Sequence, residues 1–252
     1  MLLYGRPGSY KTSFAAQFPG VVFAVGPQER GIEDLKSNGL VDPSIPVGCF
    51  DNWTSLMSLF DELITAEHSY QFLAGDSLTE YQRLLFDFVT QTHFDGKRSK
   101  FAAYGAGFDA SVPYWDLMLQ KFERMRVERN IGIILIAHSK VKTFQDPLRE
   151  AYDQYMPDLH DGKNSSIVSS TYRYCSDIGY ISPIIYTHKD DGERTKGKGG
   201  EQYEMHFNPC AAFEAKNRRN LKSVIPMGSS PQEAYSNFCA AIAACRGENG
   251  NG

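Results

Sequence analysis

Short apolar runs alternate along the chain with segments whose apolar residues recur at helical spacing. Each run is bounded by glycine, proline or polar residues and has the length of a buried strand. The segments between them have the pattern of helices that cover a sheet. The predicted strands are Met1–Tyr4, Val21–Val25, Pro46–Phe50, Tyr70–Gly75 and Ile131–Ala137. This alternation predicts an α/β fold with a mainly parallel central sheet flanked by helices.

The rest of the pattern completes one domain. Helices are predicted at 32–37, 53–66, 78–89, 113–129, 167–174 and 231–245, and a further helix follows the first strand. Two polar stretches, 91–111 and 140–166, read as irregular loops. The apolar runs at 178–188 and 201–207 flank a tip rich in glycine and lysine, which predicts a C-terminal β-hairpin. We expect a single domain over residues 1–246 and a disordered tail over residues 247–252.

Composition limits the possible functions without choosing one. The net charge of −4 gives no global basic signature, so any contact with nucleic acid must use a local patch. The five cysteines are scattered without a C-x-x-C pair, which favours reduced thiols and a cytoplasmic location. We expect no membrane association, because no apolar run approaches 18 residues and no signal peptide precedes the first strand.

The first strand leads into the segment Gly5-Arg6-Pro7-Gly8-Ser9-Tyr10-Lys11-Thr12-Ser13, which opens a helix. Gly5, Lys11 and Thr12 fit the phosphate-binding loop pattern G-x-x-x-x-G-K-[ST]. A loop that enters a helix offers free N–H groups and the positive end of the helix dipole to an anion. Lys11 adds a mobile charge for the β- and γ-phosphates, and the hydroxyl of Thr12 suits Mg²⁺. A strand-turn-helix that contains Lys-Thr by chance remains the alternative.

Tyr10 stands where the pattern has its second glycine. That position usually has a positive φ, which costs a non-glycine residue about 1–2 kcal/mol. Tyr10 therefore either strains the loop or shifts it.

Polar residues follow other predicted strands, at the edge where α/β sheets bind ligands. Asp76 ends the fourth strand and suits Mg²⁺, although it also precedes a helix that it or Ser77 can cap. Glu29 follows the second strand and is placed to activate water, but the position alone favours a solvated loop residue. His138 ends the most apolar strand. A γ-phosphate contact and a structural role at the edge of the core explain it equally well.

Two predicted loops mix cations with aromatic residues. The segments Lys97–Phe108 and Lys140–Lys163 have the composition of surfaces that track phosphates and stack on the bases of single-stranded nucleic acid. Acidic residues dilute the charge of the second segment, and two ordinary solvated loops are the alternative.

Together these segments resemble the RecA-like branch of phosphate-loop ATPases, and specifically phage-type AAA/RecA-like NTPases of the single-strand annealing or recombination class. The matching segments are LLYGRPGSYKTSFAAQFPG, FAVGPQERG, FLAGDSLTEYQ, IILIAHSKVKTFQDP with YMPDLH, and FEAKNRRNLKSVIP. They span nearly the whole chain. The departures are Tyr10 for glycine, Gly26-Pro27 where an acidic pair is frequent, and an acidic second loop.

The resemblance assigns roles to individual residues. It implies that Glu29 is the catalytic base, that Asp76 holds Mg²⁺ and that His138 senses the γ-phosphate. Lys216 and Arg218 resemble a Lys-x-Arg element that reaches into a neighbour's nucleotide site. The Lys140–Lys163 loop lies where the family binds DNA.

The expectation is therefore a RecA-like ATPase that uses ATP and Mg²⁺ in a homo-oligomer and acts on single-stranded DNA in recombination or replication. A single-strand-binding or annealing protein is a possible partner. The rivals are a DnaB-type helicase or translocase core and a nucleotide-dependent assembly switch without a DNA role. A small-molecule kinase is a more distant alternative.

Overall fold

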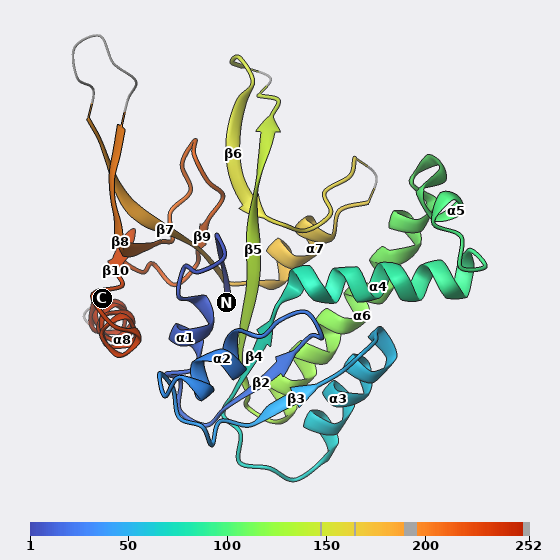
Figure 1. Ribbon diagram of the computed structural model, residues 1–252, viewed down its shortest axis with the longest axis horizontal. Helices are drawn as coiled ribbons and strands as arrows, with labels where there is room; N and C mark the ends of the chain where they lie inside the picture. The colour runs from blue at the N-terminus through green and yellow to red at the C-terminus, as the bar shows by residue number, and fades with distance from the viewer. Residues whose placement is uncertain (147, 164, 189–195, 249–252) are drawn as a thin grey trace.

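One sheet runs through the computed structural model, which describes residues 1–146, 148–163, 165–188 and 196–248 (Figure 1). The strand order is β10-β8-β7-β1-β5-β4-β2-β3. Its parallel strands are β1 (Leu2–Gly5), β2 (Val21–Val25), β3 (Val47–Cys49), β4 (Phe72–Asp76), β5 (Gly132–Phe144) and β7 (Asp177–His188). Beyond β7, the strands β8 (Lys196–His206) and β10 (Val224–Pro226) pair antiparallel. The predicted parallel α/β sheet and C-terminal hairpin are confirmed.

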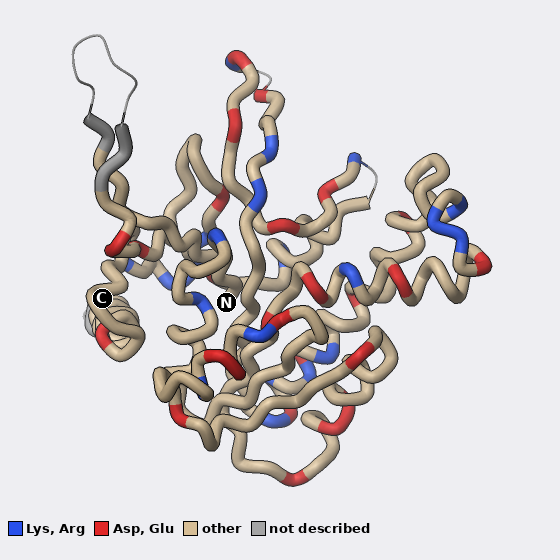
Figure 2. Tube along the Cα trace, viewed as in Figure 1, with Lys and Arg blue, Asp and Glu red and all other residues tan. Residues whose placement is uncertain are grey.

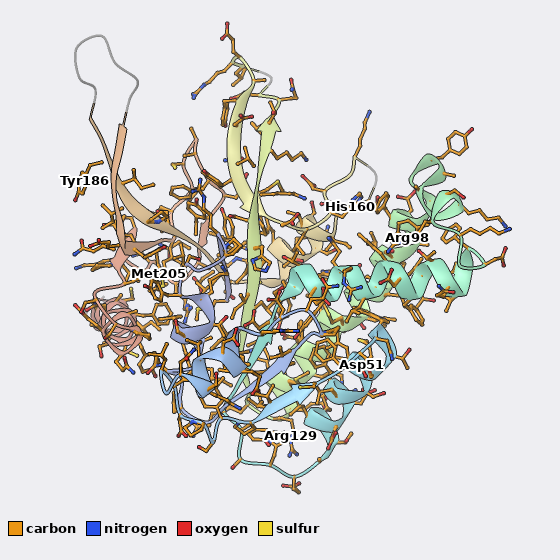
Figure 3. All side chains as sticks on the ribbon, in the orientation of Figure 1. Asp51, Arg98, Arg129, His160, Tyr186 and Met205 are labelled. Carbon is orange, nitrogen blue, oxygen red and sulfur yellow. The ribbon has the colours of Figure 1, made fainter. Side chains whose placement is uncertain are left out.

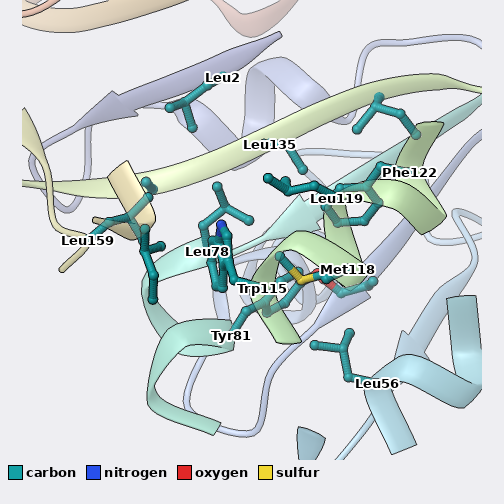
Figure 4. Packing of buried hydrophobic residues seen from close by; sticks show 14 of the residues in the cluster. Leu2, Leu56, Leu78, Tyr81, Trp115, Met118, Leu119, Phe122, Leu135 and Leu159 are labelled. Carbon is teal, nitrogen blue, oxygen red and sulfur yellow. The ribbon is translucent and has the colours of Figure 1, made fainter. Parts of the chain in front are cut away.

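Alternate residues of the central strands enter two different cores. Leu2 and Tyr4 belong to the core under α3 (Trp53–Thr65), α4 (Leu78–His93), α6 (Ala106–Glu128) and α7 (Ile167–Tyr174), part of which Figure 4 shows. Leu3 belongs to the core under α1 (Lys11–Ala15), α2 (Gly31–Ser37) and α8 (Pro231–Glu248). Because successive side chains of a strand point to opposite faces, a run that is apolar at every position requires a covered sheet on both sides.

The register of the parallel strands brings their carboxyl ends to one edge. Gly5 pairs with His138, and Val25 pairs with Asp76. Asp76 is level with Ile136 of β5. The loop after β1, the turn after β2 and the last residue of β4 therefore meet beside His138.

The polar stretch at 91–111 is mostly helical, contrary to expectation. It contains the end of α4, then α5 (Arg98–Ala102), the 3₁₀ turn η1 (Ala103–Gly105) and the start of α6. Phe101 is buried against Phe86, at 5.4 Å between ring centroids, and Phe108 packs on the same ring at 5.3 Å. These few aromatic anchors order a segment whose average composition is polar. Pro113, expected at a helix start, lies inside α6.

The stretch at 140–166 is partly a hairpin instead of an irregular loop. β5 continues past His138 to Phe144, and β6 (Tyr152–Pro157) returns antiparallel, from the pair Phe144–Tyr152 to the pair Ser139–Pro157. Figure 1 shows this hairpin and the β7–β8 hairpin projecting from the same side of the molecule. Strand β5 thus connects the core directly to a projecting arm.

The end of the chain also differs from expectation. The last helix, α8, includes Gly247 and Glu248, where the tail was expected to begin, and residues 249–252 lie outside the described part. A short strand, β9 (Lys216–Asn217), pairs with the start of β7. No helix among the described residues is long and apolar enough to cross a bilayer.

Candidate active site

The loop between β1 and α1 folds tightly against the sheet edge. A Cβ atom on Gly5 would lie 2.5 Å from the carbonyl oxygen of Ile181, so glycine is required there. Tyr10 adopts the left-handed conformation, with φ 60° and ψ 17°, and α1 begins at the next residue. The loop keeps the backbone that the missing glycine would have had, so Tyr10 strains the loop without shifting it.

Lys11 is folded back onto this loop. Its ammonium donates to the carbonyl oxygens of Gly5 (3.1 Å) and Arg6 (2.8 Å) and to the hydroxyl of Ser9 (3.1 Å). The residue is only 5% exposed, and burial lowers its pKa to about 8. A polyphosphate in the loop would be a stronger partner than two neutral carbonyls.

Thr12 and Asp76 form the oxygen pair that the sequence predicted. The hydroxyl of Thr12 donates to Oδ2 of Asp76 over 2.8 Å, across the gap between α1 and β4. Asp76 is 4% exposed, and burial raises its pKa to about 6. Among the described residues no three His, Cys, Asp or Glu side chains gather as a resident metal site. A hydroxyl and a carboxylate fit Mg²⁺ that completes its coordination with phosphate oxygens and water.

Glu29 is held by two donors on one carboxylate oxygen. Oε1 accepts from the hydroxyl of Ser77 over 2.5 Å and lies 3.2 Å from Nε2 of His138. The hydrogen bond from His138 is the main cause of the lowered pKa of Glu29. Sequence reasoning missed the contact from Ser77, because that residue also caps α4 by accepting from the amide of Glu80 (3.3 Å).

The histidine is oriented by the same contacts. Its amide donates to the hydroxyl of Thr79 over 3.1 Å, and Nδ1 is buried without a hydrogen-bond partner among the described residues. In the neutral tautomer that donates from Nε2 to Glu29, Nδ1 carries no proton, which fits an Nδ1 with no acceptor beside it. Glu80, the other acid near this edge, is engaged by both Nε and Nη2 of Arg83.

These groups line one cleft of about 390 Å³. Its walls are the phosphate-loop residues from Pro7 to Ser13, one face of α2, and the side chains of Glu29, Asp76 and His138. The structure therefore brings together the loop and the residues expected at the sheet edge.

Lys216 and Arg218 lie elsewhere. Lys216 pairs with Ile178, level with the first residues of β1, and its ammonium donates to the carbonyl oxygens of Tyr172 and Cys175 at the end of α7. Arg218 is exposed, and its side chain has no partner in the described part of the chain. Neither residue reaches the cleft of its own chain.

The two segments expected to contact nucleic acid carry cations that are already paired. Arg98 bonds to Asp87, and Lys100 lies 2.8 Å from Asp95. On the β5–β6 hairpin, Lys142 lies 2.6 Å from Asp161. Figure 2 shows acidic and basic positions intermixed on the α5 segment and on the β5–β6 hairpin. In Figure 3, Arg98 lies beside α5, and His160 lies between that segment and the hairpin.

Comparison with known proteins agrees with this geometry. The sequence profile of a family described as "AAA domain" matches residues 1–219. The chain belongs to the AAA domain family. This AAA domain protein has an α/β fold with a largely parallel central sheet, flanked by helices, and a phosphate loop after its first strand. No curated protein matches it. One solved structure, "Crystal structure of the RadB recombinase", is similar at 13% identity and a TM-score of 0.48 over 92% of this chain and 87% of that one.

The buried carboxyl of Asp76 makes a prediction about stability. Folding raises its pKa from 3.8 to about 6, so the charged carboxyl destabilises the ligand-free protein increasingly as the pH rises from about 4 to about 6, and fully above that. Asp76→Asn should raise the free energy of unfolding at pH 7, by up to about 3 kcal/mol, and the gain should vanish below about pH 4. Chemical denaturation at both pH values measures this.

Asp42→Asn is the matched control. Asp42 is exposed, and hydrogen bonds from Ser44 lower its pKa, so its removal should give no gain at pH 7. Equal or lower stability of Asp76→Asn at pH 7 would contradict a carboxylate that is strained by burial.

Proposed function

We propose that this AAA domain protein binds ATP with Mg²⁺ and hydrolyses it, and that it uses this cycle on single-stranded DNA in recombination or replication. The observation that carries the proposal is the single cleft in which Lys11, Thr12 and Asp76 face Glu29 and His138. A phosphate loop alone would support nucleotide binding. The added carboxylate–histidine pair supports hydrolysis.

The ligand-free contacts suggest how the steps are ordered. Lys11 would exchange its carbonyl partners for phosphate oxygens, and Thr12 with Asp76 would hold Mg²⁺, which neutralises phosphate charge when bound. The Nε2 proton of His138 now points to Glu29. A γ-phosphate oxygen is a competing acceptor for it, so a bound nucleotide would release Glu29 to take a proton from water.

The same histidine begins the connection to the β5–β6 hairpin. Its carbonyl accepts from the amide of Asp158 over 2.7 Å, just past the end of β6. A second link joins the loop itself to β6, because Arg6 donates to the hydroxyl of Tyr155 over 2.8 Å. A change at the γ-phosphate would thus reach the hairpin from two sides.

An assembly switch without a DNA role is the second candidate. It is favoured by the ion pairs of Arg98, Lys100 and Lys142, since cations that are already neutralised release fewer counterions from DNA. The exposed apolar residues Val141, Phe144 and Leu148 on the hairpin suit either bases or a protein partner.

Replacing Glu29 tests the hydrolytic step. Glu29→Gln keeps the shape of the side chain and removes the base, so nucleotide binding should persist while turnover falls about 10²-fold or more. Glu33→Gln on the exposed face of α2 is the control and should hydrolyse ATP like wild type. If Glu29→Gln turns over at the wild-type rate, the base lies elsewhere.

DNA binding is tested on the hairpin. We expect wild type with ATP to bind single-stranded DNA and to weaken as salt rises. Replacing Lys140, Lys142 and Phe144 with alanine should lower the affinity and reduce the slope of log K against log salt by about 1.4, because two phosphate contacts are lost at about 0.7 each.

Lys121→Ala, on α6, is the control for general loss of charge. The same test on Lys97, Arg98 and Lys100 measures the α5 segment. No wild-type binding at low salt with ATP present would favour the assembly switch.

A shared site between neighbours is tested by mixing variants. Arg218→Ala should bind ATP but hydrolyse it about 10³-fold more slowly, if Arg218 acts on a neighbour's γ-phosphate. Lys11→Ala lacks its own site and retains Arg218, so mixing the two variants should restore activity.

Arg219→Ala provides the contrast. Arg219 bonds to the buried Asp177 at 2.5 Å, so its loss should lower stability and should not be rescued by mixing. Absence of rescue for Arg218→Ala, in a protein that stays monomeric with ATP and DNA, would exclude a shared site.

A further inference from the structure

The left-handed conformation of Tyr10 directs its ring out of the phosphate loop toward β8. The ring is half exposed and meets Tyr203 edge-on, with 5.1 Å between centroids. A tyrosine at this position costs backbone strain that glycine would avoid. The ring therefore has to be explained by what it contacts outside the loop.

Beyond Tyr10 lies a second, shallow hollow with a volume of about 40 Å³, partly open to solvent. Tyr10 is the residue that lines both this hollow and the phosphate cleft. The other lining groups are apolar at the floor and polar at the rim: Met227, Ala234 and Tyr203, with Glu201, Ser229 and Ser230. Met227 and Ala234 are buried, so the floor is fixed by the core under α8.

We propose that the base of the bound nucleotide lies over the mouth of this hollow, which is too small to enclose it, and that the half-exposed ring of Tyr10 is the group that stacks on it. This inference rests on the proposed nucleotide binding and assigns the part of the site that the phosphate loop leaves open. Of the described residues that line the cleft, Tyr10 is the only phenylalanine, tyrosine or tryptophan. The opposite wall, on α2, presents Asp34, Leu35 and Asn38 and offers no ring of this kind.

The chemistry of the hollow favours a purine with an exocyclic amine. A purine presents a larger face to an aromatic ring than a pyrimidine does, and the apolar floor suits that face. The carboxylate of Glu201 at the rim is an acceptor for an amino group. Tyr203 closes the far side of Tyr10 and limits the directions in which that ring can turn.

Strain and stacking make opposite predictions for Tyr10→Gly, which restores the residue of the loop pattern and leaves the phosphate contacts intact. If Tyr10 contributes only strain, the variant should bind every polyphosphate more tightly. If the ring stacks on the base, the variant should lose affinity for ATP and not for tripolyphosphate, which has no base.

The experiment is calorimetric titration of Mg·ATP, Mg·CTP and Mg·tripolyphosphate into wild type, Tyr10→Gly, Tyr10→Phe and Leu35→Ala. We expect Tyr10→Gly to lower the ratio of ATP affinity to tripolyphosphate affinity about 10-fold, Tyr10→Phe to preserve it, and CTP to bind wild type more weakly than ATP. Tyr203→Ala should lower the same ratio by a smaller factor.

Two results would overturn the inference. One is an unchanged ratio in Tyr10→Gly, and the other is a ratio that falls in Leu35→Ala instead, which would place the base against α2. Failure of the proposed function is distinguishable from both, because wild type would then bind neither ATP nor tripolyphosphate.

Discussion

The parallel pairing of β1 and β4 with β5 is the constraint on which the site depends. It sets Gly5 beside His138 and Asp76 beside Ile136, so residues 60 or more positions apart in the sequence meet at one edge. The pairing is in turn fixed by burial on both faces, since a shift of one residue would exchange Leu2 and Leu3 between the two cores. The packing of an apolar sheet thus determines the distances between polar groups that never touch its interior.

That dependence explains which parts of the protein were predictable. The central strands and the phosphate loop could be predicted from the sequence, because an apolar run and a phosphate-loop pattern are local signals. The hairpin after His138 was not, since β6 forms by pairing with β5, and its buried Met156 packs against helices that are distant in the sequence. The helical segment at 98–112 was not predicted for a related reason: Phe101 is ordered by Phe86 and Phe108, which lie 15 and 7 residues away. Ser77 was recognised as a cap, but its contact with Glu29 depends on where the turn after β2 ends.

In the ligand-free site, the charged and polar groups form hydrogen bonds with one another. Lys11 is held by loop oxygens, Thr12 is bound to Asp76, and Glu29 is bound by Ser77 and His138. Each of these contacts stands in for one that a nucleotide and its metal would make, so buried charges are not left unpaired before the ligand arrives. A base that is hydrogen-bonded on its reactive oxygen, with a lowered pKa, is a poor proton acceptor. The hydrolysis proposed for this site would therefore require that binding first rearrange His138, which would tie turnover to the presence of the γ-phosphate.

One of the two links from the cleft to the hairpin, the contact between Arg6 and Tyr155, leads into an aromatic cluster at the foot of the hairpin. The ring of Tyr155 stacks on Tyr180 with 5.3 Å between centroids, and Tyr180 stacks on Phe213 at 5.0 Å, while Arg6 reaches Tyr155 from the phosphate loop. Packed rings shift as a unit more readily than they deform. Because Lys142 is already paired with Asp161, a strand of DNA gains little from the hairpin's charge unless a movement of this cluster separates that pair. Nucleotide-dependent exposure of Lys142, and not its mere presence, is what would make the hairpin a DNA-binding arm.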